Sequence, residues 1–559
     1  NGNFGAAVKE DGTVWTWGAN TNGQLGNGTT DSPKLNAIQV GSSGSNAMRI
    51  THGSVTNQDT GIQRVEFNNE LITNVLIAEN EEFHIFEDGI SLNQSFSLLP
   101  DSQEVKAGSV EYTSFNPNIA TVGKYTGIVT PVKGIYGTAI IIAKSDGYSS
   151  IIRVSIKPQD TDDVKSVAKP MVATGASHTI ALKYDGTVWT WGNNTNGQLG
   201  NNSTENSSSP VQVKSADGNT FLTNIIEISA GSGHNMALRN DGTVWTWGSN
   251  TYGQLGNGSS VNSMLPVQVK SADGNSFLAD IVQISAGYVH SMALKKDGTV
   301  LAWGRNDGGQ LGNNNTSNKS LPVQVKGGAS GSEYLTDVVQ VTAGNWHSMA
   351  LKANGTVYAW GWGQYGQLGN GYTTNRDDTD YYSYEKIYSA PVQVLNGAQT
   401  SETGYLKEVV QIDAMGGTGR GEKNRFGTSL AVTESKEVYG WGNSMYGALG
   451  VNASIVSTPV RVATGISTAV QVAGGSKSGS DDYHVNSIGN TGYTYILKED
   501  GTVSSLGYNV NGELGNGAKA STTAVQKVSN LTEIMQVAGS KNGNFGAAVK
   551  EDGTVWTWG

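Results

Sequence analysis

Short runs of β-branched and aromatic residues alternate with glycine-rich and asparagine-rich stretches along most of this chain. One unit consists of the apolar runs Ile226–Ser229 and Ala230–Leu238, the phrase DGTVWTWG (Asp241–Gly248), the stretch NTYGQLGNG (Asn250–Gly258) and the run PVQV (Pro266–Val269). Runs of this length and composition predict strands. The Asp-Gly pair between two of them predicts a two-residue hairpin turn. Each unit is therefore expected to form four short strands.

The phrase at the centre of the unit occurs eight times, complete or degenerate. Its copies begin at residues 11, 185, 241, 297, 354, 435, 500 and 552, so successive starts lie 174, 56, 56, 57, 81, 65 and 52 residues apart. A period in the fifties with strand-like content is typical of propeller blades. Four short strands cannot bury both faces of their sheet alone, so neighbouring units must stack, and radial stacking closes a ring. The seven copies from residue 169 onward predict a seven-bladed β-propeller.

The repeated pattern G-x-x-H-x-x-A-L, DG-x-V-x-x-WG, N-x-x-GQLG-x-G and P-x-x-V resembles the regulator-of-chromosome-condensation repeat. The resemblance implies a seven-bladed propeller. That family spans nucleotide-exchange factors, ubiquitin ligases and bacterial inhibitor proteins, so the fold implies little about function. The inserted segment described next, and the lack of a basic tail in this sequence, argue against a nucleotide-exchange role.

The 174-residue interval is too long for one unit and predicts an inserted domain. Strands are expected there at Gln63–Phe67, Val75–Ile77, Ile140–Lys144 and Ile151–Ile156. The segment VEYTSFNPNIATVGKYTGIVTPVKGIYGTAIIIAKSDG (Val110–Gly147) resembles the bacterial immunoglobulin-like domains of intimin-type and invasin-type surface proteins. The resemblance implies a rigid spacer that carries no chemistry.

The chain is thus expected to be all-β, a seven-bladed β-propeller plus an immunoglobulin-like β-sandwich. The polar segment Pro158–Pro170 is expected to be a linker. The predicted parts are a propeller blade in residues 1–40, the immunoglobulin-like domain with its linkers in residues 41–168, and seven repeat units of the propeller in residues 169–559.

Residues 1–18 are identical to residues 542–559, which predicts a parent protein that repeats with a period of 541 residues. In that array, residues 41–168 would link successive rings. In the alternative, residues 19–40 complete the blade begun by residues 542–559, and residues 1–18 add to the open sheet edge of a neighbouring subunit. Both hypotheses predict fibre-like self-association. Because the chain starts at Asn1, we expect a mature piece or an excerpt.

Composition restricts the classes of function that fit. The formal net charge is −11, and no basic cluster of five or more residues occurs, which argues against a nucleic-acid surface. The chain has no cysteine, which excludes disulfide scaffolds and thiolate metal sites. No apolar run approaches the roughly 18 residues of a membrane-spanning helix. We expect an extracellular or cell-surface location in a bacterium.

Four histidines recur at one position of successive units: His178, His234, His290 and His347. A ring of imidazoles can bind a metal, but Phe4, Tyr493 and Thr428 replace histidine in other units. These replacements favour packing and hydrogen bonding to the backbone over metal binding. The regularly placed tryptophans of DGTVWTWG are likewise expected to pack within and between blades, although tryptophan can also form a carbohydrate-binding surface.

Three insertions break the repeat and are the predicted partner-binding surface. They are GYTTNRDDTDYYSYEKIYSA (Gly371–Ala390), GGTGRGEKNRFG (Gly416–Gly427) and GGSKSGSDDYHVNSIGNTG (Gly474–Gly492). Tyrosine-rich loops make effective contact surfaces, because rigid rings lose little entropy on binding. The aspartate-rich stretch is also a candidate for calcium, although it lacks a complete set of ligands. The candidate residues are Tyr372, Asp377, Asp378, Asp380, Tyr381, Tyr382, Tyr384, Tyr388, Arg420, Arg425, Asp481, Asp482 and Tyr483.

Nothing in the sequence predicts an enzyme. Neither a G-x-S-x-G elbow nor an HExxH motif occurs, and no cofactor is predicted. The leading hypothesis is a non-enzymatic structural or adhesive surface protein that self-associates into a fibre or tandem array and binds a glycan or protein ligand. Multivalency in such an array would strengthen weak contacts. The alternatives are a soluble inhibitor-like propeller that binds one protein target and, third, a propeller-hosted carbohydrate-active enzyme.

Overall fold

The computed structural model describes most of the chain from residue 111 onward and five strands before it. The described residues are 4–8, 14–18, 34–39, 74–78, 83–84, 111–133, 137–145, 148–157, 168–328, 333–373, 387–399, 403–416, 426–462, 465–478, 490–540, 546–550 and 555–559. Apart from one short 3-10 helix (η2, Met445–Gly447), all regular elements in these ranges are strands.

Within the described ranges, the repeat units form six four-stranded sheets, each with its strands in chain order, followed by a three-stranded sheet. The strands of the first three sheets are β11 (Met171–Thr174), β12 (His178–Leu182), β13 (Val188–Gly192) and β14 (Ser207–Gln212); β15 (Ile225–Ala230), β16 (His234–Arg239), β17 (Val244–Gly248) and β18 (Ser263–Gln268); and β19 (Ile281–Ala286), β20 (His290–Lys295), β21 (Val300–Gly304) and β22 (Lys319–Gln324). Those of the next three are β23 (Val338–Ala343), β24 (His347–Lys352), β25 (Val357–Trp362) and β26 (Ile387–Gln393); β27 (Val409–Met415), β28 (Thr428–Thr433), β29 (Val438–Asn443) and β30 (Ile455–Val462); and β31 (Ala469–Ser478), β32 (Asn490–Lys498), β33 (Val503–Gly507) and β34 (Thr522–Lys527). The three-stranded sheet holds β35 (Ile534–Gly539), β36 (Gly546–Lys550) and β37 (Val555–Trp558).

The order of strand and turn segments within the repeat explains how each sheet forms. In the second sheet, β16 and β17 pair antiparallel from His234 opposite Gly248 to Leu238 opposite Val244. The Asp-Gly turn predicted between them is present, and its Gly242 has a φ of +78°, a conformation that favours glycine. The predicted four-stranded antiparallel unit is therefore confirmed.

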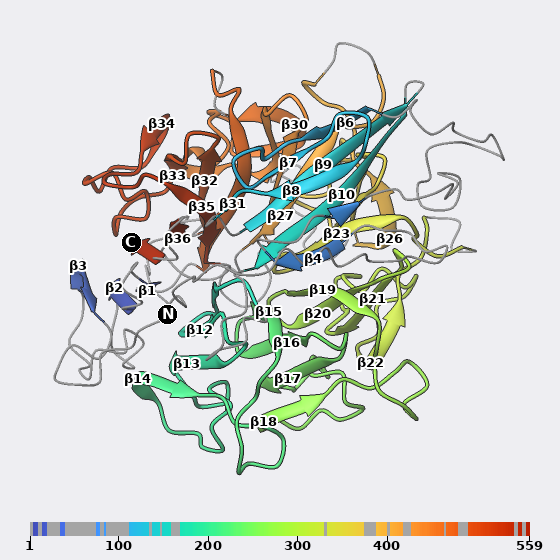
Figure 1. Ribbon diagram of the computed structural model, residues 1–559, viewed down its shortest axis with the longest axis vertical. Helices are drawn as coiled ribbons and strands as arrows, with labels where there is room; N and C mark the ends of the chain where they lie inside the picture. The colour runs from blue at the N-terminus through green and yellow to red at the C-terminus, as the bar shows by residue number, and fades with distance from the viewer. Residues whose placement is uncertain are drawn as a thin grey trace, which may run out of the picture.

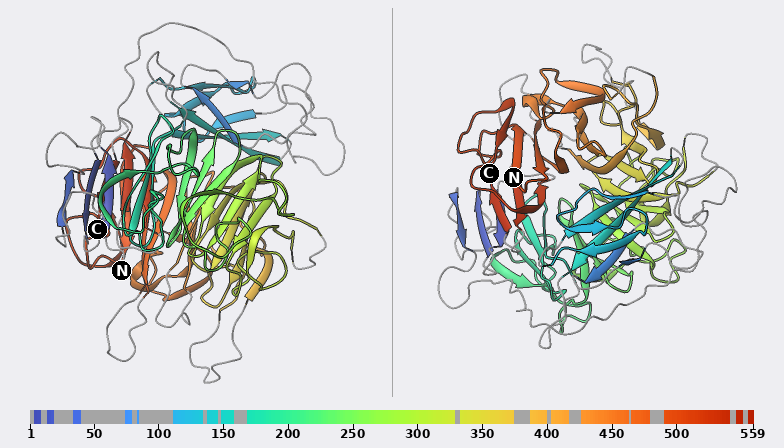
Figure 2. Two further views of the ribbon diagram at one scale, coloured as in Figure 1. Left: turned by 90° about the horizontal axis from the view of Figure 1, so that it is seen from below. Right: turned by 45° about the horizontal axis from the view of Figure 1, so that its top comes forward.

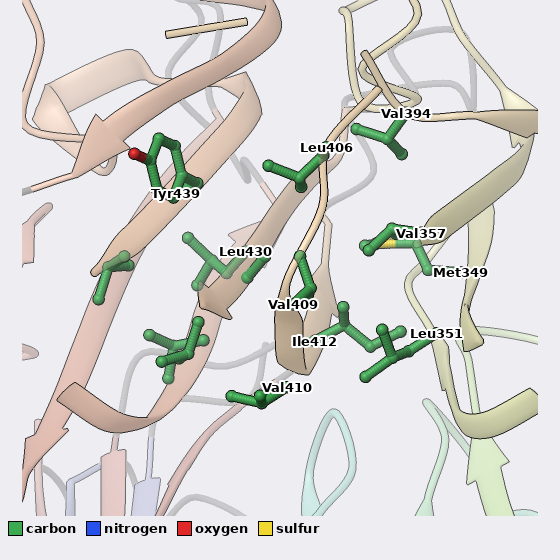
Figure 3. Close-up of a cluster of buried hydrophobic side chains, with 14 of the residues drawn as sticks. Met349, Leu351, Val357, Val394, Leu406, Val409, Val410, Ile412, Leu430 and Tyr439 are labelled. Carbon is green, nitrogen blue, oxygen red and sulfur yellow. The ribbon is translucent and has the colours of Figure 1, made fainter. Parts of the chain in front are cut away.

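The sheets stand around a common axis and pack face to face, as Figures 1 and 2 show. Apolar side chains fill the space between neighbours; Figure 3 shows the cluster in which Met349 and Val357 of one sheet meet Val409, Ile412 and other residues of the next. Another buried cluster joins the first sheet to the last two, since Trp191 and Val172 share it with Tyr495 and Trp558. The apolar core thus continues around the axis, as the stacking argument predicted.

Among the described residues between β3 and the first repeat sheet, the strands form two sheets. One has the order β4-β10-β9-β6 and the other the order β5-β8-β7. Their strands are β4 (Asn74–Ala78), β5 (Phe83–His84), β6 (Glu111–Ser114), β7 (Ala120–Val122), β8 (Ile128–Pro131), β9 (Gly137–Ser145) and β10 (Tyr148–Lys157). The strands expected at Val75–Ile77, Ile140–Lys144 and Ile151–Ile156 are confirmed. The strand expected at Gln63–Phe67 and most of the expected linker lie outside the described residues.

This insertion lies over one end of the propeller axis, as the left view of Figure 2 shows. Its Phe115 and Ile140 share a buried cluster with Val339 and Val410 of two propeller sheets. An ion pair joins Lys144 of the insertion to Glu434 of the propeller. The contact between the two parts is therefore both apolar and charged.

The two identical ends of the chain form equivalent hairpins. Near the N-terminus, β1 (Phe4–Val8), β2 (Val14–Gly18) and β3 (Lys34–Gln39) form a three-stranded sheet in that order. Strand β1 lies beside β37 of the last sheet. The hairpin β1-β2 therefore pairs with β3, which corresponds to the fourth strand of a repeat unit. Its copy β36-β37 pairs with β35, which corresponds to the first strand.

Glycines of the GQLG stretch are required by the tryptophans of the next sheet, which gives a direct test of the packing. Gly256 has a φ of +66°, and a methyl group on it would lie 2.7 Å from Nε1 of Trp303. We expect Gly256→Ala to destabilise the protein by about 1–3 kcal/mol more than Gly517→Ala, because overpacking adds to backbone strain. Gly517 is a matched control, with a φ of +78° and no atom within 4 Å of the added methyl. Equal melting temperatures of the two variants would contradict this account.

Candidate functional site

The repeated histidines join neighbouring sheets. His178, His234, His290 and His347 are all fully buried. The Nε2 atom of each lies 2.9, 3.1, 3.0 and 3.0 Å, respectively, from a side-chain oxygen of the next sheet. These oxygens belong to Asn235, Ser291, Ser348 and Ser429. Burial lowers the pKa of His178 to about 4, so that its imidazole is neutral near pH 7.

The residues that bond the histidines also form a second contact between the same two sheets. Ser291 donates a hydrogen bond to the backbone carbonyl of Gln254, at 2.8 Å, and Nε1 of Trp303 donates to the same oxygen at 2.9 Å. The arrangement repeats at the carbonyls of Gln198, Gln310 and Gln367. In the described part of the chain, no three residues that could hold a metal ion come together. The histidines thus act in packing, with side chains rather than backbone as their partners.

A second ring of contacts lies on the innermost strands and was not predicted. We call it the amide ring: the equivalent residues Glu227, Gln283, Gln340, Gln411, Gln471 and Gln536, with Met171 at the same place in β11. Oε1 of Gln340 accepts a hydrogen bond from the backbone of Ile412 at 3.0 Å, and its Nε2 donates to the carbonyl of Ile412 at 3.0 Å. Gln411 and Gln471 contact the next sheet in the same two ways. The ring therefore joins the sheets around the axis.

A cavity of about 510 Å³, the axial cavity, lies between the insertion and the amide ring. The insertion contributes Arg153 of β10, with Asn116 and Thr138 nearby, and the propeller contributes Lys169 and the amide ring. Nη1 of Arg153 lies 3.3 Å from Oε1 of Gln340 and 3.2 Å from the carbonyl of Val410. Arg153 therefore attaches the insertion to two propeller sheets and also borders the cavity.

Burial controls the charges in the axial cavity. It raises the pKa of Glu227 to about 8, although a hydrogen bond from Ile284 and the nearby Arg153 and Lys169 act in the opposite direction. Burial also lowers the pKa of Lys169 to about 8 and that of Arg153 to about 10. Near pH 7, Glu227 is then largely a neutral carboxylic acid, which can both accept and donate hydrogen bonds as the glutamines do. The two basic side chains remain mostly charged.

The strand ends that the predicted loop insertions follow lie at the other end of the propeller. In an antiparallel sheet with its strands in chain order, connections after the first and third strands leave from one end and those after the second and fourth from the other. The three insertions follow β25, β27 and β31, which are third or first strands. The domain insertion precedes the first strand β11 and so joins the opposite end. We call the end with the loops the loop face.

Only two of the predicted partner-binding residues fall within the described residues. Tyr372 is half-buried in the connection after β25. Tyr388 is half-buried in β26, opposite Gly361 of β25. The others lie outside the described residues: Asp377, Asp378, Asp380, Tyr381, Tyr382, Tyr384, Arg420, Arg425, Asp481, Asp482 and Tyr483.

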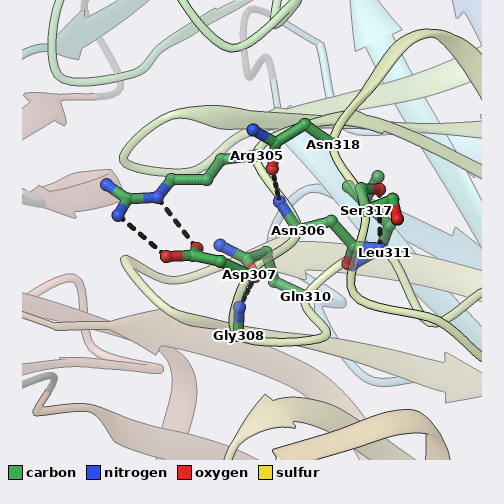
Figure 4. A network of polar contacts seen from close by, with 8 residues as sticks. All are labelled: Arg305, Asn306, Asp307, Gly308, Gln310, Leu311, Ser317 and Asn318. Atoms are coloured by element: carbon green, nitrogen blue, oxygen red, sulfur yellow. Dashed lines mark hydrogen bonds and ion pairs between the residues drawn. The ribbon is translucent and has the colours of Figure 1, made fainter.

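The loop face also carries an arginine that sequence reasoning missed. Arg305 is 5% exposed, and its guanidinium carbon lies 4.6 Å from the ring centre of Tyr252 and 4.5 Å from that of Trp346. Its Nε and Nη2 atoms contact the two carboxylate oxygens of Asp307 at 2.8 and 2.9 Å (Figure 4). The stack joins loops of three successive sheets. The sequence signal that could have identified this stack is the charged pair Arg305 and Asp307, in a loop that is uncharged in neighbouring units.

In the described ranges, no helix is long and apolar enough to cross a membrane.

The raised pKa of Glu227 predicts a pH dependence of stability. Since the folded protein holds this proton more tightly than the unfolded chain, ionisation of Glu227 lowers the free energy of unfolding as the pH rises from about 4.5 to about 8. We expect Glu227→Gln to remove this loss and to be more stable than the native chain by more than about 1 kcal/mol at pH 8, because one pKa unit corresponds to about 1.4 kcal/mol. Denaturant unfolding at pH 5 and pH 8 measures the difference.

The matched control is Glu333→Gln, which changes an exposed carboxylate. It should leave the slope of stability against pH unchanged. A Glu227→Gln variant that keeps the native slope between pH 5 and pH 8 would show that Glu227 is ionised in the folded protein.

Comparisons with known proteins agree with this architecture. The RCC1-like domain family matches residues 144–478 and 221–559, and the regulator of chromosome condensation (RCC1) repeat matches residues 11–52. The ultraviolet-B receptor UVR8 of Arabidopsis thaliana is 28% identical over 373 residues, which cover 62% of this chain and 78% of the receptor. The human E3 ubiquitin-protein ligase HERC2 is 29% identical over 304 residues, which cover 54% of this chain but only 5% of the ligase. The crystal structure of human WBSCR16 shares the fold, with a TM-score of 0.50, 21% identity, and coverage of 70% of this chain and 87% of that one. The resemblance to regulator-of-chromosome-condensation repeats is therefore confirmed, and this chain belongs to the RCC1-like domain family of β-propellers.

Proposed function

We propose that this chain is a non-enzymatic structural or adhesive protein of a bacterial surface, which self-associates as a unit of a filament or tandem array. The observation that carries the proposal is the duplicated hairpin. Residues 1–18 and 542–559 are identical, yet one copy is paired with β3 and the other with β35. The two three-stranded sheets thus hold complementary parts of one four-stranded repeat sheet.

The register of β3 supports this interpretation. Trp15 of β2 lies opposite Gln39, and Thr16 lies opposite Ile38. A complete sheet has the same arrangement, since Trp245 lies opposite Gln268 and Thr246 lies opposite Val267. Because β37 has the sequence of β2, β3 of another copy can pair in this register with β37 when it replaces β1, which lies beside β37 in this structure. The sheet β35-β36-β37-β3 would then resemble its neighbours, and strand addition would link the copies.

The polar side chains of the repeat favour a structural role over catalysis. The four histidines and the amide-ring glutamines Gln340, Gln411 and Gln471 form hydrogen bonds between sheets. Groups held in this way are buried and already partnered, which suits a rigid scaffold. We further propose that the two-sheet insertion is an immunoglobulin-like spacer, consistent with the buried turn residue Asn116, whose Oδ1 accepts a hydrogen bond from Ile140 at 3.0 Å.

A soluble, protein-binding propeller is the second candidate. The strands that the three insertions follow, β25, β27 and β31, belong to three successive sheets, and the stack of Arg305 and Trp346 lies at the same end of the propeller. Clustered insertions on one rigid face suit the capture of a protein or glycan. In this candidate each ring would act singly.

Self-association tests the proposal. We expect sedimentation velocity to show concentration-dependent growth of the chain, and electron micrographs to show filaments. Ile38→Pro should abolish both, because Ile38 occupies a paired position in the ladder of β3 and proline has no N–H group to donate there. Ile38→Thr, which keeps the N–H group and a β-branched side chain, is the matched control and should still assemble. Isolated discs at every concentration would overturn the filament proposal and favour the second candidate.

A further inference from the structure

Beyond self-association, the structure contains a cavity that no repeat unit forms by itself. The axial cavity, about 510 Å³ in volume, is bordered by two basic side chains from different parts of the chain, Arg153 of the insertion and Lys169 before β11. Its volume lies within the range of 300–1,000 Å³ that is common for sites of small molecules. We propose that the axial cavity binds a small carboxylate that also carries hydroxyl groups, of the size of a uronic acid.

The two cations supply the reason for an anionic ligand. Nη1 of Arg153 is shared between two carbonyl oxygens, those of the Gln340 side chain and the Val410 backbone. Within the described residues, the ammonium group of Lys169 has neither a hydrogen bond nor an ion pair. Lys169 is half-buried. A cation without a close partner in such a site is costly, and a carboxylate beside it removes that cost. The ligand's carboxylate is therefore assigned to Lys169 and to the guanidinium nitrogens of Arg153 that make no hydrogen bond among the described residues.

Glu227 borders the same cavity, but it does not serve as the carboxylate partner of Lys169 and Arg153. It occupies the amide-ring position, and its Oε2 accepts a hydrogen bond from the backbone of Ile284 at 3.3 Å. It is thus held toward the next sheet, as Gln283 is by the backbone of Val341 at 2.9 Å. In its protonated form it leaves the charge of Arg153 and Lys169 uncompensated.

The hydroxyl requirement comes from the amide ring. Oε1 of Gln536 is buried and has no hydrogen-bond partner among the described residues. The corresponding oxygen of Gln471 accepts from the backbone of Val537 at 2.9 Å, whereas the sheet beyond Gln536 begins with β11, where Met171 takes the ring position. A buried acceptor without a donor destabilises the fold. A ligand hydroxyl would satisfy it, while Met171 and Ile281 cover apolar parts of the ligand.

Titration calorimetry with D-glucuronate and D-glucose tests the proposal on the intact chain. The two sugars differ only in the carboxylate, so we expect glucuronate to bind at least tenfold more tightly than glucose. Lys169→Met should weaken glucuronate binding at least tenfold without lowering the melting temperature of the unliganded protein, because Lys169 makes no hydrogen bond or ion pair among the described residues that would be lost. Lys407→Met removes the same charge from an exposed site outside the cavity and should leave binding unchanged.

A second variant separates the hydroxyl contact from the charge. Gln536→Leu should weaken glucuronate binding and leave the binding of acetate, which has no hydroxyl group, unchanged. Equal affinities for glucose and glucuronate, or native affinity in Lys169→Met, would overturn the carboxylate assignment. Sulfate or acetate binding as tightly as glucuronate would overturn the hydroxyl requirement. These measurements do not depend on filament formation. A negative binding result would therefore leave the proposed self-association unaffected, and a negative assembly result would leave the proposed binding site unaffected.

Discussion

The structure depends on one constraint: a four-stranded sheet is too thin to bury its own faces, so each sheet is stable only between two others. The contact that meets this constraint is specific. Trp303 lies against Gly256 of the previous sheet, and its indole nitrogen donates to the carbonyl of Gln254. A side chain larger than glycine's would keep the ring out, and a lost donor would leave a buried carbonyl less well satisfied. Four of the tryptophans in the repeated phrase make this indole contact.

This constraint explains why residues with chemical capacity act here in packing. His290 contacts Ser348 of the next sheet, and Gln340 contacts both backbone groups of Ile412. Stacking of the sheets excludes water from these polar groups. Each group therefore forms its hydrogen bond with the neighbouring sheet instead of with water. It follows that the chemically free surface of the propeller is concentrated at its two ends, where connections rather than strands are exposed. The insertion covers one of these ends and the loop face forms the other.

The sequence was sufficient to predict the four-stranded unit, the Asp-Gly turn, the stacking and the packing role of the histidines, because each depends on local composition or on the period. It was not sufficient for the axial cavity. Gln340 is a polar residue in the mostly apolar strand β23. Polar residues are common in strands that have one face less buried than the other. Arg153 contacts residues 187 and 257 positions away, and no periodicity links them. Lys169 fell within a stretch expected to be a linker. Such long-range pairs become visible only when the ring is assembled.

The break in the amide ring and the position of the insertion coincide, and the physical reason is the closure of the ring. Every described amide-ring residue faces a sheet that follows it in the chain, except Gln536, whose following sheet around the axis is the first. At that joint Met171 offers no amide, and Oε1 of Gln536 is left without a partner. The insertion enters the chain just before Met171 and brings Arg153 to the axis, where it contacts the far side of the ring at Gln340 and Val410. The domain thus ties the closing joint to the opposite sheets, so that its docking and the closure of the ring stabilise each other.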